Sequence, residues 1–164
     1  MRIISYSSII LIAISIFSCT KQKSTLFQMV PGNESGITFN NKIIETDSFN
    51  ILTSEYIFNG GGVAVGDFNN DNLPDVFFSG NQVNNKLYLN QGDFKFKDVS
   101  KEAGIEATNQ WNTGVALADV NNDGFLDMYV CSAMLNSEEA KKNIFFVHQG
   151  LNENGVPTFK NMAK

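Results

Sequence analysis

Two nine-residue segments rich in aspartate and asparagine constrain this chain more than any other feature. They read Asp67-Phe-Asn-Asn-Asp-Asn-Leu-Pro-Asp75 and Asp119-Val-Asn-Asn-Asp-Gly-Phe-Leu-Asp127. Each segment places oxygen-bearing side chains at its positions 1, 3, 5 and 9. Each also follows a similar small and apolar lead-in, Gly62–Gly66 in the first copy and Gly114–Ala118 in the second. Because the loop is copied together with its flanks, the sequence predicts a structural repeat with the same loop in both units.

The spacing of the oxygen donors suits a calcium ion. Calcium takes about six to eight oxygen ligands from carboxylates, amide carbonyls, backbone carbonyls and water. Three carboxylates in one tight loop would also repel one another without a cation between them. The sequence therefore predicts two structural Ca²⁺ sites, and the alternative, two Asx-rich turns that bind nothing, stays open. The predicted ligands are the side chains of Asp67, Asn69, Asp71 and Asp75 with the Leu73 carbonyl, and those of Asp119, Asn121, Asp123 and Asp127 with the Phe125 carbonyl.

The loops differ from the EF-hand, the calcium motif nearest to them in spacing. An EF-hand needs a bidentate glutamate at position 12 and a helix on either side. Position 12 is Phe78 in the first copy and Val130 in the second, and both follow residues typical of strands. At position 6 the second loop has Gly124, which readily adopts a left-handed backbone, whereas the first has Asn72, which does so less easily. We therefore expect strands around both loops, and we expect Asn72 to affect the affinity of the first loop rather than its geometry.

The first residues of the chain have the pattern of a secretion signal. Arg2 supplies a positive charge, and the apolar run Ile3–Phe17 is too short and too polar for a comfortable membrane span. The run ends at Ser18-Cys19, which resembles the lipobox of bacterial lipoproteins. We therefore expect residues 1–18 to be a signal peptide, Cys19 to be acylated and residues 19–25 to form a tether; a signal peptide cleaved elsewhere is the alternative. The lipid would anchor the protein to the outer membrane of a bacterial cell envelope, on its periplasmic or its outer face.

Charge and residue types argue against several classes of function. The formal net charge is −5 and the chain has no basic cluster, so nucleic acid is not an expected partner. His148 is the only histidine, and in a hairpin strand we expect it to be a surface or packing residue. No Ser-His-Asp set, Cys–His pair or zinc-ligand spacing is present, so we do not expect an enzyme. Cys131 is expected to be a small buried residue of a strand.

The repeat extends beyond the acidic loops. Asn85–Gly92 matches Asn143–Gly150, and Phe96–Lys101 matches Phe159–Lys164. Phe27–Val30 is a weaker echo of the residues that begin at Phe96. Each unit then contains four strands, which is the content of one propeller blade. We predict an all-β fold, a partial β-propeller of about two and a half four-stranded blades in residues 26–164, with copies at about 59–105 and 111–164.

The pattern of apolar residues indicates how the strands lie in each blade. Gly62–Gly66 and Val76–Ser79 are continuous small or apolar runs, so we expect innermost strands that are buried on both faces. Lys86–Asn90 and Phe94–Asp98 alternate or nearly alternate, as half-exposed strands do. Trp111, just ahead of the second copy, is expected to pack between blades, and an exposed ring that stacks on a ligand is the alternative.

These motifs resemble FG-GAP repeats, also called VCBS-type repeats. The resemblance rests on Gly-Val-Ala-Val-Gly-Asp-Phe-Asn-Asn-Asp from Gly62, Asn-Lys-Leu-Tyr-Leu-Asn-Gln-Gly from Asn85, and Asp-Val-Ser-Lys-Glu-Ala-Gly-Ile from Asp98. Such repeats build the β-propeller of integrin α subunits and of many bacterial secreted proteins. The segment Asn50–Gly62 is typical of the cartilage-acidic-protein-like lipoproteins of the Bacteroidota.

The resemblance implies a function as well as a fold. It implies Ca²⁺ at both loops and a binding module for an unknown protein or carbohydrate ligand. The alternatives are a structural part of a larger propeller protein or envelope assembly, and a hydrolase or lyase accessory domain. Because a propeller needs about four to eight blades to close, we also expect the chain to be an N-terminal fragment.

Overall fold

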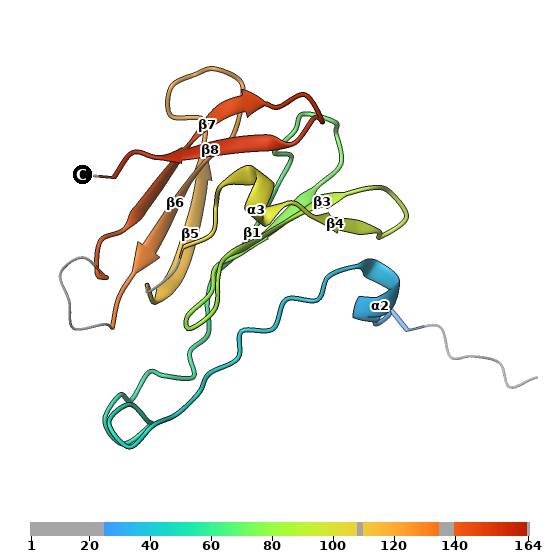
Figure 1. The fold of residues 1–164 in the computed structure, drawn as a ribbon. Coiled ribbons are helices and arrows are strands. Elements are labelled where there is room, and N and C mark those ends of the chain that lie inside the picture. The colour runs from blue at the N-terminus through green and yellow to red at the C-terminus, as the bar shows by residue number, and fades with distance from the viewer. Residues whose placement is uncertain (1–24, 108–109, 135–139, 164) are drawn as a thin grey trace, which may run out of the picture.

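The computed structural model describes residues 25–107, 110–134 and 140–163, and its fold is all-β. Two antiparallel sheets, each of four strands in sequence order, lie side by side (Figure 1). This arrangement confirms the predicted pair of four-stranded blades. The first sheet consists of β1 (Val63–Gly66), β2 (Asp75–Phe78), β3 (Lys86–Asn90) and β4 (Phe96–Asp98), and the second of β5 (Asn112–Ala118), β6 (Asp127–Ser132), β7 (Ile144–Leu151) and β8 (Pro157–Asn161).

Each acidic segment is the connection of one hairpin. Gly66 pairs with Asp75 at the end of the β1–β2 ladder, and Ala118 pairs with Asp127 at the end of the β5–β6 ladder. The strands β1 and β5 are also in contact, so the two hairpins are neighbours. Position 12 of each segment lies in a strand, as predicted, and neither loop has the flanking helices of an EF-hand.

The N-terminal part of the described chain, before β1, does not form the strands of a further blade. It holds the short helix α2 (Gly32–Ser35) and an isolated bridge between Thr46 and Phe49, but no strand is described before β1. The chain instead makes a long excursion below both sheets before it reaches β1 (Figure 1). The half-repeat predicted at Phe27–Val30 therefore does not form a strand in the described residues.

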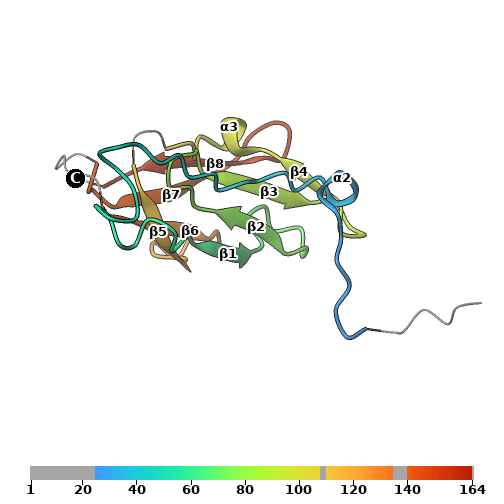
Figure 2. The same cartoon turned by 90° about the horizontal axis from the view of Figure 1, so that it is seen from below.

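A trace of the repeat is nevertheless present in this segment. Gly36 caps the C-terminal end of helix α2 and Gly104 caps that of helix α3 (Ser100–Ala103), and both glycines have a left-handed backbone. A Cβ atom on Gly36 would overlap the Phe96 carbonyl oxygen, and one on Gly104 would lie 3.4 Å from the Phe159 carbonyl oxygen. Two views agree that α2 lies beside β4 (Figures 1 and 2). Since Phe96 and Phe159 are equivalent positions, α2 approaches the first sheet much as α3 approaches the second.

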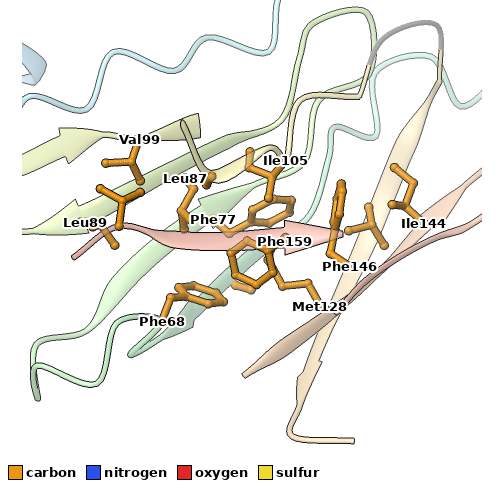
Figure 3. Close-up of a cluster of buried hydrophobic side chains, with 14 residues drawn as sticks. Phe68, Phe77, Leu87, Leu89, Val99, Ile105, Met128, Ile144, Phe146 and Phe159 are labelled. Carbon is orange, nitrogen blue, oxygen red and sulfur yellow. The ribbon is translucent and has the colours of Figure 1, made fainter. Parts of the chain in front are cut away.

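The hydrophobic core lies between the two sheets. Figure 3 shows side chains of β2 and β3 pointing toward those of β6, β7 and β8. Burial of this apolar surface is the main force that holds one sheet on the other. The buried members are Ala64, Phe68, Phe77, Leu87, Leu89, Val99, Ala103, Ile105, Met128, Val130, Ile144, Phe146, Val156 and Phe159.

A second, polar contact ties the sheets together at the end away from the acidic loops. The buried Asn112 donates from Nδ2 to Oδ1 of Asn85 at 3.0 Å and accepts from Ser132 Oγ at 2.8 Å. The buried Asn81 donates to the Asn112 carbonyl oxygen at 2.8 Å. Because buried amides are costly unless they are hydrogen-bonded, this network fixes how the second sheet sits on the first.

Three expectations about strand burial are wrong. Strand β1 is not buried on both faces, because Val63 and Val65 are exposed. Strand β3 is not half-exposed, because Leu87 and Leu89 face the second sheet while Tyr88 is covered on the other side. Cys131 is exposed rather than buried, since it lies on the face of β6 opposite to the core residue Val130.

Several expectations concern residues outside the described ranges. The predicted signal peptide, residues 1–18, and the predicted acylation site Cys19 both lie in the N-terminal stretch that the structure does not describe. Among the described residues, no helix has the length and apolar character needed to cross a membrane.

Candidate metal centre

The first acidic loop is held in shape by its own side chains. Asp67 accepts backbone N–H bonds from Asp71 at 3.0 Å and from Asn72 at 2.7 Å. Asp71 accepts from the Leu73 N–H at 2.8 Å and from Asn69 Nδ2 at 2.9 Å. Such Asx hydrogen bonds replace backbone pairing in a tight turn. They also direct the oxygens of positions 1, 3 and 5 to the same small region of the loop.

The second loop repeats this geometry bond for bond. Asp119 accepts from the Asp123 N–H at 3.1 Å and from the Gly124 N–H at 2.9 Å. Asp123 accepts from the Phe125 N–H at 2.9 Å and from Asn121 Nδ2 at 2.8 Å. The same local sequence therefore folds in the same way in both copies.

The backbone at position 6 is left-handed in both loops. Its φ angle is +69° at Asn72 and +88° at Gly124. Asparagine is one of the few residues besides glycine that visit this region with regularity. Asn72 thus adopts the conformation that the turn needs, in agreement with the expectation that this position does not alter the loop's geometry.

The aspartate at position 9 closes each loop from inside the sheet. Asp75 is fully buried and accepts N–H bonds from Phe68 at 2.9 Å and from Asn90 at 2.8 Å. The equivalent residue of the second copy, Asp127, accepts from the Val120 N–H at 3.1 Å and from the His148 N–H at 2.8 Å. Position 9 therefore links its loop to the third strand of the same sheet.

Burial leaves an electrostatic mark on Asp75. Loss of hydration raises the pKa of this carboxyl from 3.8 to about 6, and the charges of Asp71 and Asp67 add to the rise. Its two backbone hydrogen bonds act in the opposite direction but are weaker. A buried carboxylate that is close to two others gains stability from a nearby cation, which makes the first loop electrostatically suited to one.

The donor atoms of both loops suit calcium, but the carboxylates alone do not form a complete metal site. All ten predicted ligands offer oxygen, which is the donor that Ca²⁺ prefers. Each carboxylate oxygen has two lone pairs, so an N–H bond leaves acceptor capacity on the same atom. Among the described residues, no group of three or more His, Cys, Asp or Glu side chains is arranged so that it could hold a metal by itself. A full coordination shell in either loop therefore needs the asparagine oxygen and the backbone carbonyl as well, and the ligand assignment stays a prediction.

The two loops touch each other. Asn70 Nδ2 donates to the Gly124 carbonyl oxygen at 3.1 Å. Nε2 of the buried His148 lies 3.0 Å from the Phe68 carbonyl oxygen. Since Phe68 belongs to the first loop and His148 to the second sheet, these contacts join the candidate centres across the sheet boundary.

His148 and Trp111, the two residues weighed as candidates for other roles, are both packing residues. The His148 ring stacks on Phe125, with centroids 4.3 Å apart, and burial lowers its pKa. Trp111 is 1% exposed and meets Phe49 edge to face at 5.3 Å. An exposed ring that stacks on a ligand is thus ruled out for Trp111, whose partner is the N-terminal excursion. Sequence reasoning missed the position of His148 between the loops, because no local pattern marks a contact between sheets.

Comparison with known proteins points to the same repeat. Residues 67–130 match the family model of the FG-GAP-like repeat. The chain is 39% identical over 69 residues to cartilage acidic protein 1 of Xenopus tropicalis, Homo sapiens and Mus musculus. The alignment covers 42% of this chain and 10–11% of each relative, so the chain spans about a tenth of the relatives it matches. The chain therefore carries an FG-GAP-like repeat region, which points to a propeller-like interaction module rather than to a catalytic domain.

Proposed function

We propose that this chain is an exported, lipid-anchored calcium-binding repeat module that presents its surface to a protein or glycan partner. The calcium ions would be structural and would sit in the loops at residues 67–75 and 119–127. The observation that carries the proposal is the identical hydrogen-bonded geometry of these loops, each lined by oxygen donors.

The role of calcium in this proposal is to hold each hairpin and its sheet in place. The described chain forms only short strands, and its exposed Cys131 has no disulfide. A metal ion that binds the folded state and not the unfolded chain adds to the stability of the fold. An ion in each loop would relieve the repulsion among Asp67, Asp71 and Asp75 and their counterparts.

Thermal melting with and without calcium tests the proposal. Extracellular modules bind Ca²⁺ with a Kd of about 10⁻⁴–10⁻³ M. At about 100 times Kd, each site adds about 2.7 kcal/mol to the free energy of unfolding. That gain corresponds to a rise in melting temperature of about 5–10 °C per site. We expect Ca²⁺ to produce such a rise, EDTA to reverse it, and Mg²⁺ to be a poor substitute.

Matched variants separate loop binding from a general effect of charge. Asp71→Asn and Asp123→Asn each remove a loop carboxylate but keep an oxygen that can accept the turn's N–H bond. Asp93→Asn removes one carboxylate at the β3–β4 turn, outside both loops. Each loop variant should lose about half of the calcium-induced stabilisation, and the control should keep all of it. A melting temperature that ignores Ca²⁺ in the unsubstituted chain would refute the proposal.

The membrane part of the proposal rests on the sequence alone. Acylation of Cys19 would anchor the protein to the outer membrane of a bacterial cell envelope. Metabolic labelling with a fatty acid tests this directly. Label should enter the unsubstituted precursor and be absent from the Cys19→Ala precursor.

A further inference from the structure

Among the described residues, His148 is the one side chain of the second sheet that forms a hydrogen bond with the first acidic loop. Its backbone N–H is bonded to Asp127 of the second loop at 2.8 Å. Its Nδ1 accepts from the Gly150 N–H at 2.8 Å, which assigns the hydrogen to Nε2 and makes Nε2 the donor to Phe68 at 3.0 Å. One residue thus contacts both loops.

The equivalent residue of the first sheet shows what is special about a histidine here. Asn90 takes the same place, bonded through its N–H to Asp75 and through Oδ1 to the Gly92 N–H at 2.9 Å. Its Nδ2, however, donates to the Pro74 carbonyl oxygen of its own sheet at 3.0 Å. The longer imidazole of His148 likewise accepts from a nearby backbone N–H, but its donor Nε2 reaches a carbonyl oxygen of the other sheet.

Ring packing makes this link stiff. The His148 ring stacks on Phe125 of the second loop at 4.3 Å and meets Phe159 of β8 edge to face at 4.9 Å. Phe159 in turn meets Phe68 of the first loop edge to face at 6.1 Å. Phe68 is fully buried. Because buried side chains are closely packed, a shift of Phe125 in the second loop is transmitted through these rings to the first loop.

The contact between Asn70 and Gly124 adds a second, exposed link. It joins position 4 of the first loop to position 6 of the second at 3.1 Å. Position 6 of each loop donates its N–H to the aspartate at position 1. The two links therefore join one hydrogen-bonded loop directly to the other, and these are the loops that an ion would order.

We propose that His148 couples the two acidic loops, so that ordering of one loop by a cation favours ordering of the other. This inference rests on the proposed calcium sites for its biological role, but the coupling itself is a property of the loops. A ligand that orders one part of a linked pair lowers the ordering cost of the other part, which produces positive cooperativity.

A double-mutant cycle read by NMR tests the coupling. The Asn72 amide reports Ca²⁺ binding at the first loop, while Asp123→Asn disables the second. We expect Asp123→Asn to weaken the first site by about fivefold, at the low end of known coupling factors. In the His148→Asn background, which copies the residue of the first sheet, Asp123→Asn should weaken the first site much less, because only the Asn70–Gly124 link remains. A simple loss of packing would instead weaken the first site equally in both backgrounds, and that result would overturn the proposal.

Two further measurements keep the inference separable from the calcium proposal. Amide exchange at Asp71 and Asn72 in EDTA reads the coupling without metal. Asp119→Ala removes the acceptor of two N–H bonds in the second loop and should speed this exchange clearly more when His148 is present. If the loops ignore Ca²⁺ but this dependence holds, the proposed function fails and the coupling stands. If both loops bind Ca²⁺ but the dependence is absent, the coupling fails alone. Should His148→Asn not fold, His148→Leu replaces it, because leucine fills a similar volume in this buried site and lacks the Nε2 donor to Phe68.

Discussion

The two sheets have the same sequence pattern but bury equivalent positions to different extents. Phe77 of β2 is 0% exposed, whereas its counterpart Tyr129 of β6 is 44% exposed. Likewise Phe68 is 0% exposed and its counterpart Val120 is 57% exposed. The second sheet covers one face of the first, while its own equivalent face stays open within the described residues. Burial in this fold is thus decided by the neighbouring sheet rather than by the residue.

The acidic loops show the opposite behaviour. Their hydrogen bonds agree pair by pair between the copies, although the first loop, which includes the buried Phe68, is less exposed than the second. Their shape is set by side chains that bond to the backbone two to five residues away, and these are local contacts. The shape of the candidate site is therefore determined locally, whereas the burial of the strands depends on how the sheets stack.

The largest expected effect comes from the ring at the covered face. Phe77→Ala should reduce the free energy of unfolding by about 3–5 kcal/mol, because it leaves a cavity between the sheets. The matched change Tyr129→Ala should cost less than about 1 kcal/mol, since much of that ring is already in water. Urea unfolding measures both values. Equal losses would mean that the sheets do not pack as described.

A pair of equivalent glycines at the boundary between β1 and β5 tests the same difference in packing between the two sheets. A Cβ atom on Gly62 would overlap the Thr113 carbonyl oxygen, whereas one on the equivalent Gly114 would meet nothing within 4 Å. Gly62→Ala should therefore cost about 1–3 kcal/mol through displaced backbone. Gly114→Ala should be neutral or stabilise by up to about 1 kcal/mol, by restricting the unfolded chain. Chemical unfolding of the two variants gives the difference, and a larger cost at Gly114 would contradict the packing.

The buried carboxyl of the first loop provides a smaller and site-specific effect. In EDTA, the carboxyl carbon of Asp75 should titrate with a pKa of about 6 in an NMR experiment. Because this folded-state pKa is raised, the group contributes stability at low pH that is lost as the pH rises from about 4 to about 6. Calcium should lower the midpoint, since a cation favours the charged form. A midpoint that stays the same in Ca²⁺ would argue against an ion next to Asp75.

The smallest effect is expected for an ion pair that only the first sheet has. Lys86 Nζ lies 2.7 Å from Asp98 Oδ2 near the surface, and the second sheet has Ile144 and Asn161 at these positions. Burial acts to raise the pKa of Asp98, but the hydrogen bonds from Lys86 and Ser100 outweigh it, so the net shift is downward. The pair's contribution is thus present above the ordinary aspartate pKa and lost as the pH falls through the lowered value. Lys86→Ile should cost less than about 1 kcal/mol, and added salt should shrink that cost. A loss of several kcal/mol that salt does not change would contradict this reading.

Much of the fold could be predicted from the sequence, because the repeat is written in local patterns. The hairpins around the loops followed from aspartate and asparagine spacing with strand-forming residues after it, and the left-handed backbone at Asn72 followed from its position in the turn. The exposure of Val63, Val65 and Cys131 could not be predicted, because the apolar pattern does not tell which face another sheet covers. The placement of His148 was missed for a related reason: its partner Phe68 is 80 residues earlier in the chain. A contact between residues so far apart in the sequence is seen only once the two sheets are stacked.

The most direct test of the account is the number of calcium ions that the folded chain binds. Equilibrium dialysis against millimolar Ca²⁺, followed by metal analysis, should give two ions per chain. Asp71→Asn and Asp123→Asn should each reduce this number toward one, and Asp93→Asn should leave it at two. A folded chain that retains no calcium, or one whose calcium content is the same in all three variants, would contradict the assignment of the two loops as metal sites.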